Sequence, residues 1–74
     1  MSEHHSSEIQ SLVKMANQIA DNFSFHDDAV ARTVDHIQRF WAPSMQKSLM
    51  AYVDGGGAGL KPGTLDAVRQ LAGD

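Results

Sequence analysis

The glycine-rich segment 55–59 (Gly-Gly-Gly-Ala-Gly) is the most conspicuous candidate for binding chemistry, because glycine loops can cradle phosphate groups. The P-loop pattern requires a glycine, four residues, a second glycine, a lysine and then a serine or threonine. Counted from Gly55, the second glycine would fall on Leu60, and Lys61 is followed by Pro62 instead of a hydroxyl residue. The dinucleotide-binding pattern also fails at Leu60, and both motifs follow a strand rather than a helix. The segment therefore predicts a helix end with a flexible or tightly turned connection, and not a phosphate site.

The four histidines do not form a metal-binding pattern. His4 and His5 are adjacent near the N-terminus, His26 precedes two aspartates, and His36 follows Asp35. Two histidines share one face of a helix when they are three or four residues apart, and no pair here has that spacing. The chain has no cysteine, which excludes disulfides, thiolate metal sites and iron–sulfur ligation. We therefore predict no metal ligand and no cofactor-binding residue in this chain.

The carboxylates and serines supply groups that catalysis uses, but none of them lies in a recognisable catalytic signature. The chain has nine Asp and Glu residues, and several of them lie where helix caps are expected. No nucleophile elbow is present. A domain of 74 residues also leaves little room for a deep pocket. The sequence therefore predicts no catalytic residue, and we expect that the chain is not an enzyme by itself.

The composition is that of a small folded domain whose function depends on other proteins. Of the 74 residues 42% are hydrophobic and 20% are charged, and the net charge of −3 includes only six Lys and Arg. This balance excludes a basic footprint for nucleic acid or an anionic membrane, and no apolar run approaches the ~20 residues of a membrane span. The polar N-terminus and the lack of cysteine favour a cytoplasmic location. Below roughly 70–80 residues a single core rarely supplies more than ~3–5 kcal/mol, so we expect a partner protein to add stability.

The periodicity of the apolar residues predicts an all-α fold, a small bundle of three main helices plus a short C-terminal helix. No segment alternates with a period of two, so no strand is expected. Residues 1–6 lack any periodicity and are predicted to form a flexible N-terminal tail. Residues 7–74 are predicted to form a single helical domain.

Caps and breaks set the expected ends of the helices. Asp27 or Asp28 is expected to cap the second helix with its side chain, and Gly55 to end the third in a left-handed conformation. Asp35 and Arg39 are expected to form an i,i+4 ion pair. The first helix is predicted to span 7–23. The second is predicted to run from its cap at 27 or 28 to the break at 42–43. The third and fourth are predicted to span 43–54 and 62–72.

A cluster of aromatic and methionine side chains near the break at Pro43 is the best candidate for an interface, because Trp, Tyr and Met are enriched there. The cluster consists of Phe40, Trp41, Met45, Met50 and Tyr52. We expect Phe40, Met45 and Tyr52 to lie mainly in the core, whereas Trp41 and Met50 fit the core or an interface equally well. The predicted partner-binding residues are Trp41, Pro43, Met50 and Tyr52.

Three segments, taken in order, resemble the delta subunit of bacterial NAD-dependent, molybdenum-containing formate dehydrogenase. They are Lys-Met-Ala-Asn-Gln-Ile at 14–19, Phe-Trp-Ala-Pro-Ser-Met at 40–45, and the stretch from Leu49 through Asp54-Gly55-Gly56 to Gly59-Leu60 and Pro62. The resemblance covers roughly residues 12–72. One departure is Ala42, where the family commonly has Asp, and this loses a side-chain cap worth about 1 kcal/mol.

The resemblance implies an accessory role in a larger enzyme. In this family the alpha subunit carries molybdopterin guanine dinucleotide and iron–sulfur clusters, and the beta and gamma subunits carry flavin and further clusters. The delta subunit is implied to hold no cofactor and to support assembly or stability of the complex. The partner implied for this chain is the alpha subunit, and through it the beta and gamma subunits.

Two alternatives remain open at the level of sequence. The chain is alternatively a transient assembly factor for insertion of the molybdenum cofactor, which would leave the same residue pattern. It is alternatively an unrelated small helical interaction protein that forms a homodimer. If the chain is instead the delta subunit, it is also compatible with a homodimer when isolated.

Overall fold

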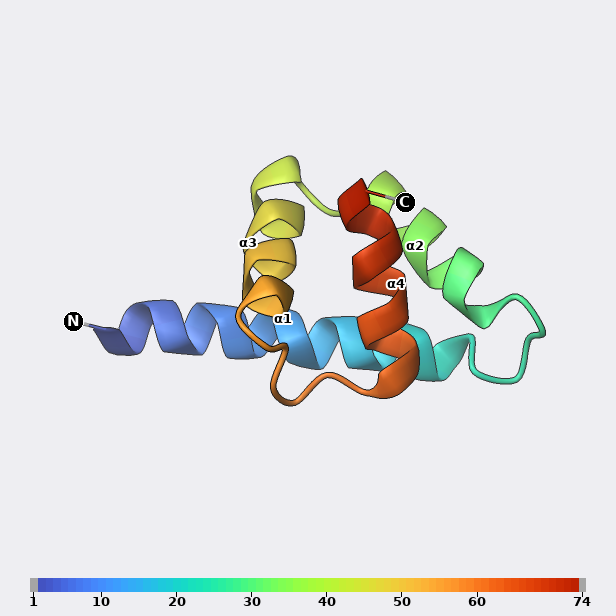
Figure 1. Ribbon diagram of the computed structural model, residues 1–74, viewed down its shortest axis with the longest axis horizontal. Coiled ribbons are helices and arrows are strands. Elements are labelled where there is room, and N and C mark those ends of the chain that lie inside the picture. Colours follow the sequence, from blue (N-terminus) through green and yellow to red (C-terminus); the bar gives the residue numbers. More distant parts are fainter. Residues whose placement is uncertain (1, 74) are drawn as a thin grey trace.

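The computed structural model describes the backbone of residues 2–73 and the side chains of residues 8–73. Within this range the chain forms four α-helices and no strand, which confirms the all-α prediction. The helices are α1 (Ser2–Asn22), α2 (Ala29–Phe40), α3 (Pro43–Asp54) and α4 (Pro62–Gly73). The other three helices pack on one side of the long α1, and the N-terminal end of α1 extends beyond them (Figure 1).

The helix bounds follow the predicted breaks with one large difference, at the start of α1. This helix begins at Ser2, so most of the segment predicted as a tail has helical backbone, and it ends at Asn22. Whether that segment is flexible stays a prediction. The third helix has the predicted bounds, with Pro43 in its first turn, and α4 runs one residue further than predicted. Since α2, α3 and α4 each have 12 residues, the C-terminal helix is a full member of the bundle.

All four helices contribute to one core. Ile37, Leu49 and Val68 are completely buried, and burial of such a side chain stabilises a fold by about 1.5–3 kcal/mol. The close contact of α2 with α4 relies on smaller buried residues, Thr33 and Ala67 among them. The buried cluster is made of Leu12, Ala16, Ile37, Trp41, Leu49 and Val68.

The two neighbouring aromatics at the end of α2 lie in opposite environments, and only the position of Trp41 had been left open by the sequence. Phe40 is 72% exposed, so the prediction that it lies in the core was wrong, and Trp41 is only 6% exposed. The reason is local backbone geometry. Helix α2 stops at Phe40, and Trp41 has extended backbone (φ −92°, ψ 139°). Helical periodicity does not apply to a residue beyond the helix end, and the turn carries the indole into the core above Ile37.

Candidate docking surface

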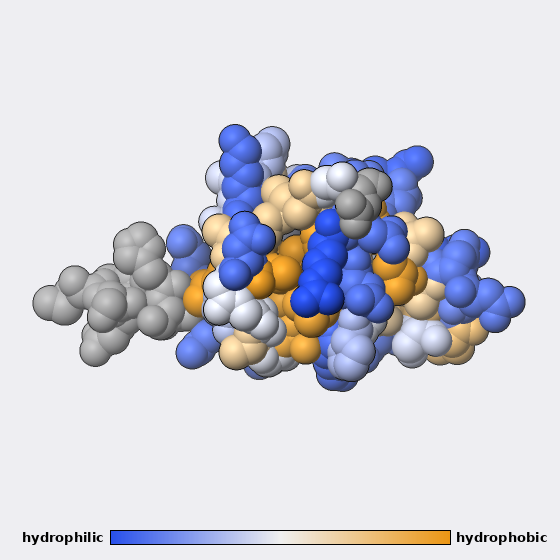
Figure 2. Space-filling view, in the orientation of Figure 1, coloured by the Kyte–Doolittle hydropathy of each residue, from blue (hydrophilic) through white to orange (hydrophobic). Residues whose placement is uncertain are grey.

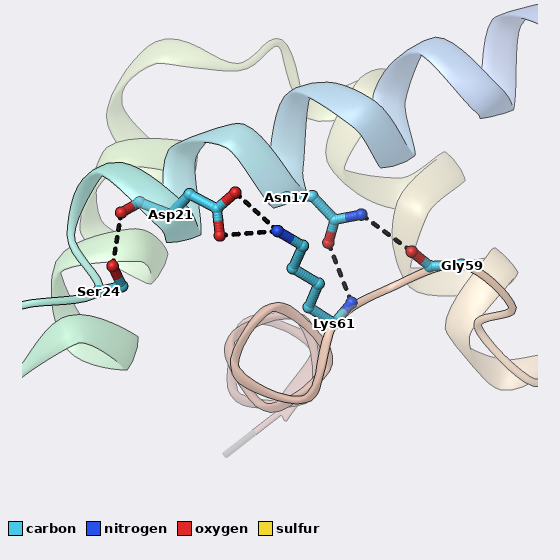
Figure 3. A network of polar contacts seen from close by, with 5 residues as sticks. All are labelled: Asn17, Asp21, Ser24, Gly59 and Lys61. Atoms are coloured by element: carbon cyan, nitrogen blue, oxygen red, sulfur yellow. Dashed lines mark hydrogen bonds and ion pairs between the residues drawn. The ribbon is translucent and has the colours of Figure 1, made fainter.

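The glycine loop, which we define as residues 55–61, is tied to α1 by the side chain of Asn17 (Figure 3). The amide Nδ2 donates to the Gly59 carbonyl oxygen at 2.9 Å, and the backbone N–H of Lys61 donates to Oδ1 at 3.0 Å. The Lys61 ammonium reaches the Asp21 carboxylate at 2.7 Å, one helical turn further along α1. Three polar contacts therefore fix the loop across sequence separations of 40 to 44 residues.

Helix α3 also forms hydrogen bonds with the glycine loop. The Tyr52 hydroxyl donates to the Ala58 carbonyl oxygen at 2.6 Å, and the Gly57 N–H donates to the Tyr52 carbonyl oxygen at 3.0 Å. Gly57 is buried, and its backbone has the left-handed conformation (φ +67°). A Cβ added to it would lie 2.8 Å from a Leu65 methyl carbon. The prediction of a left-handed Gly55 was wrong, because its φ is −85°. The third helix ends without that conformation, and positive φ occurs at later glycines of the loop. These contacts make the loop a structural connection between α1, α3 and α4.

The corner between α2 and α3 is fixed by Gln46. Its side-chain amide donates to the Trp41 carbonyl oxygen at 2.9 Å and to the Ile37 carbonyl oxygen at 3.3 Å. The Ile37 carbonyl also accepts a hydrogen bond from the Trp41 backbone N–H at 3.0 Å, so Gln46 adds a second donor there and supplies a donor to the Trp41 carbonyl beyond the helix end. Ala42 at the N-cap of α3 makes no side-chain cap, as its residue type requires. The corner therefore holds Trp41 in a single place and leaves Pro43 exposed beside it.

An apolar surface begins at this corner and continues onto α1. Phe40 and Met15 are 72% and 41% exposed, which is unusual for large hydrophobic side chains. They border a shallow hollow between α1, α2 and the start of α3, and the indole of Trp41 contributes to its lining. We call this the corner hollow. Its lining residues are Met15, Gln18, Ile19, Asn22, His36, Phe40, Trp41 and Met45.

A second depression, the α2 groove, runs along the outer face of α2 and shares Phe40 and His36 with the corner hollow. The two rings pack at a centroid distance of 4.7 Å. Arg39 donates to Asp35 at 3.1 Å, which confirms the predicted pair. The groove is lined by Phe23, Asp28, Ala31, Arg32, Asp35, His36, Arg39 and Phe40.

The first turn of α2 differs from the prediction. Asp28 is at the N-cap position, but its side chain makes no cap hydrogen bond. Instead it accepts a hydrogen bond from Arg32 Nε at 2.7 Å. That hydrogen bond holds the pKa of the Asp28 carboxyl below its ordinary value. The arginine one turn further on therefore competes successfully with the backbone N–H groups for this carboxylate.

The four predicted partner-binding residues do not lie on one surface. Trp41 lies in the floor of the corner hollow, and Pro43 lies exposed beside it. Met50 lines a different depression between α3 and α4, where Figure 2 shows apolar side chains framed by polar ones. The Tyr52 hydroxyl donates a hydrogen bond to the glycine loop and is therefore engaged within the domain. Phe40 belonged to the aromatic and methionine cluster predicted near Pro43 but was assigned to the core, and Met15 was not among the predicted interface residues.

Two classes of site have no candidate within the described residues. No group of three or more histidine and carboxylate side chains there could hold a metal ion. In that part of the chain no helix is long and apolar enough to cross a membrane. With no cysteine in the sequence, the residues present also do not fit an iron–sulfur cluster. The fold and its surface thus define a small helical domain that carries a shallow hollow with exposed apolar side chains at its border.

Comparison with known proteins assigns this domain to a family. A family profile described as NADH-dependent formate dehydrogenase delta subunit FdsD matches residues 11–68. The chain belongs to this family, as the three sequence segments suggested. No curated protein matches the chain, and no solved structure does. Two of the segments that carry the resemblance contain Asn17 and the glycine loop, which are joined by the hydrogen bonds from Asn17 to Gly59 and Lys61.

Proposed function

We propose that this chain is a cofactor-free, non-catalytic accessory subunit of a cytoplasmic NAD-dependent formate dehydrogenase. In this proposal it docks on the large catalytic alpha subunit, reaches the beta and gamma subunits through it, and supports assembly or stability of the complex. Family membership supports the assignment to formate dehydrogenase. The exposed apolar border of the corner hollow supports docking through that hollow, which we call the docking mode.

The single observation that carries the docking mode is the exposure of Phe40. Its side chain is 72% exposed and packs on the half-buried His36 ring, and covering such a side chain contributes about 1.5–3 kcal/mol to association. Met15 on α1 adds a second, flexible apolar contact on the same hollow. A partner that fills the hollow removes both side chains from water and thereby favours the folded form of this small domain by mass action.

In this proposal Trp41 takes part directly, because its indole lines the hollow. Pro43 is exposed two residues further along the chain but does not line the hollow, and its role stays a prediction. Met50 would require a second contact area between α3 and α4, and its role stays a prediction. Tyr52 would act through the glycine loop, whose position its hydroxyl fixes.

Co-purification with a matched pair of phenylalanine variants tests the proposal. Phe40→Ala removes an exposed ring on the hollow, and Phe25→Ala removes a ring that is 81% exposed but does not line it. Tagged Phe40→Ala is expected to recover at least tenfold less alpha subunit than wild type, while Phe25→Ala recovers a similar amount. Equal recovery by both variants would contradict the docking mode. The ratio of this chain to alpha subunit in the mature enzyme separates a permanent subunit from a transient assembly factor.

A further inference from the structure

The outer face of α2 carries charges in an order that is complementary to itself. Asp28, Arg32, Asp35 and Arg39 follow one another at helical spacing and line the same groove. Each arginine donates through Nε to one carboxylate oxygen, Oδ1, of the acid one turn before it. Side-chain exposure in the two pairs ranges from 47% to 70%, so both keep surface for further contacts.

A second copy of α2 laid antiparallel would match every one of these charges. When the two-fold axis passes between residues 33 and 34, Asp28 faces Arg39 of the other copy and Arg32 faces Asp35 of the other copy. A parallel arrangement in register would place each charge against its like. Like charges in direct opposition destabilise a contact, so the charge order selects the antiparallel arrangement.

The apolar groups of the groove fit the same alignment. Phe40 lies at the C-terminal end of α2, and Phe23, which precedes α2 in the chain, lines the same groove with its ring 6.1 Å from that of His36. The antiparallel alignment brings the exposed Phe40 ring toward Phe23 and His26 of the other copy, whose own rings are 6.1 Å apart. Ala31, near the axis, has a small side chain that allows close approach of the two backbones.

We propose that the free chain pairs with a second copy of itself through antiparallel α2 helices. The pairing is weak, because a 12-residue helix is about 18 Å long and buries less than the ~800 Å² per partner of a standard interface. It is a concentration-dependent dimer with a dissociation constant in the micromolar range or above. This inference does not rest on the proposed function.

One consequence does rest on the proposed function. Phe40 borders both the α2 groove and the corner hollow, so a paired chain cannot offer the same ring to a large subunit. The dimer is then a form of the free chain that must dissociate before docking.

The decisive experiment is sedimentation equilibrium of the free chain with two charge reversals, Arg32→Glu and Asp35→Lys. Each reversal breaks one exposed ion pair within α2, and each homodimer then contains two repulsive contacts across the axis. Each variant alone is expected to dimerise at least tenfold more weakly than wild type. Mixed in equal amounts they form a heterodimer in which Glu at position 32 meets Lys at position 35 and the native Arg32 meets the native Asp35. The mixture is therefore expected to recover dimerisation.

Controls keep each outcome decisive. Lys47→Glu changes charge by the same amount on the exposed side of α3 and is expected to dimerise as wild type does. Phe40→Ala leaves the charges intact and is expected to weaken the dimer, which provides a second test should a charge variant fail to fold by circular dichroism. A wild-type chain that stays monomeric at 1 mM overturns the proposal. Dimerisation that is insensitive to both reversals, or no recovery on mixing, overturns the antiparallel α2 interface. Since only the free chain is measured, failure here leaves the docking proposal standing.

Discussion

Replacing Gly57 with alanine is expected to destabilise this domain strongly, for two reasons that the structure separates. The residue has φ +67°, where an L-residue costs roughly 1–2 kcal/mol. The added Cβ would also lie 2.8 Å from the Leu65 side chain in a buried site, and such overpacking costs roughly 1–3 kcal/mol. The sum, about 2–5 kcal/mol, is comparable with the ~3–5 kcal/mol that a core of this size supplies.

Two other glycines are matched controls for these two contributions. Gly59→Ala has the positive φ (+88°) but only an ordinary contact at 3.7 Å, so it should lose about 1–2 kcal/mol. Gly63→Ala has neither a positive φ nor an atom within 4 Å, so it should be neutral or stabilise by about 0.4–1 kcal/mol.

Thermal unfolding followed by circular dichroism measures all three variants. For a domain of this size 1 kcal/mol shifts the melting temperature by roughly 4–8 °C, so the three variants should be clearly resolved. Equal losses for Gly57→Ala and Gly59→Ala would refute the steric contribution of Leu65. A Gly57→Ala variant as stable as Gly63→Ala would refute the whole reading of the loop.

Three further perturbations test other parts of the structure. Asn17→Ala removes both hydrogen bonds that tie the glycine loop to α1 and should cost about 1–3 kcal/mol in urea unfolding, with faster amide exchange at Lys61; unchanged exchange there would contradict the clamp. Trp41→Ala should cost about 3–5 kcal/mol because the indole is buried, whereas Phe40→Ala should change thermal stability by less than about 0.5 kcal/mol; similar losses for both would contradict their placement. The lowered pKa of Asp28 means that its contribution is present above its ordinary pKa of 3.8 and is lost as pH falls through the lower folded value. Asp28→Asn should therefore remove part of the acid-induced loss of stability below about pH 4 in a pH series of melting temperatures, and an unchanged acid limb would contradict the Arg32 contact.

The regular parts of this fold could be predicted from the sequence because their signals are local. Pro43 excludes a helical conformation before it and suits the first turn after it, which fixed both the end of α2 and the start of α3. The i,i+4 pair of Asp35 and Arg39 needs only a helix to form.

The parts that could not be predicted depend on contacts between distant segments. Asp28 is the N-cap residue of α2, one of the two predicted, but its predicted side-chain cap is absent because Arg32 binds the carboxylate, and the choice between two partners of similar strength is set by small geometric differences. Phe40 and Trp41 are adjacent, and only the extended backbone of Trp41 decides which of them enters the core. Asn17 looked like one of several polar residues on the outer side of the first helix, because its partners lie more than 40 residues away.

Affinity purification of the tagged chain from its native host, with metal and cofactor analysis of what is recovered, tests the central claim most directly. If this chain is an accessory subunit, the purification recovers a molybdenum-containing formate dehydrogenase whose large subunit contacts this chain. Recovery of no such enzyme, together with undiminished formate oxidation in a strain that lacks this chain, would contradict it.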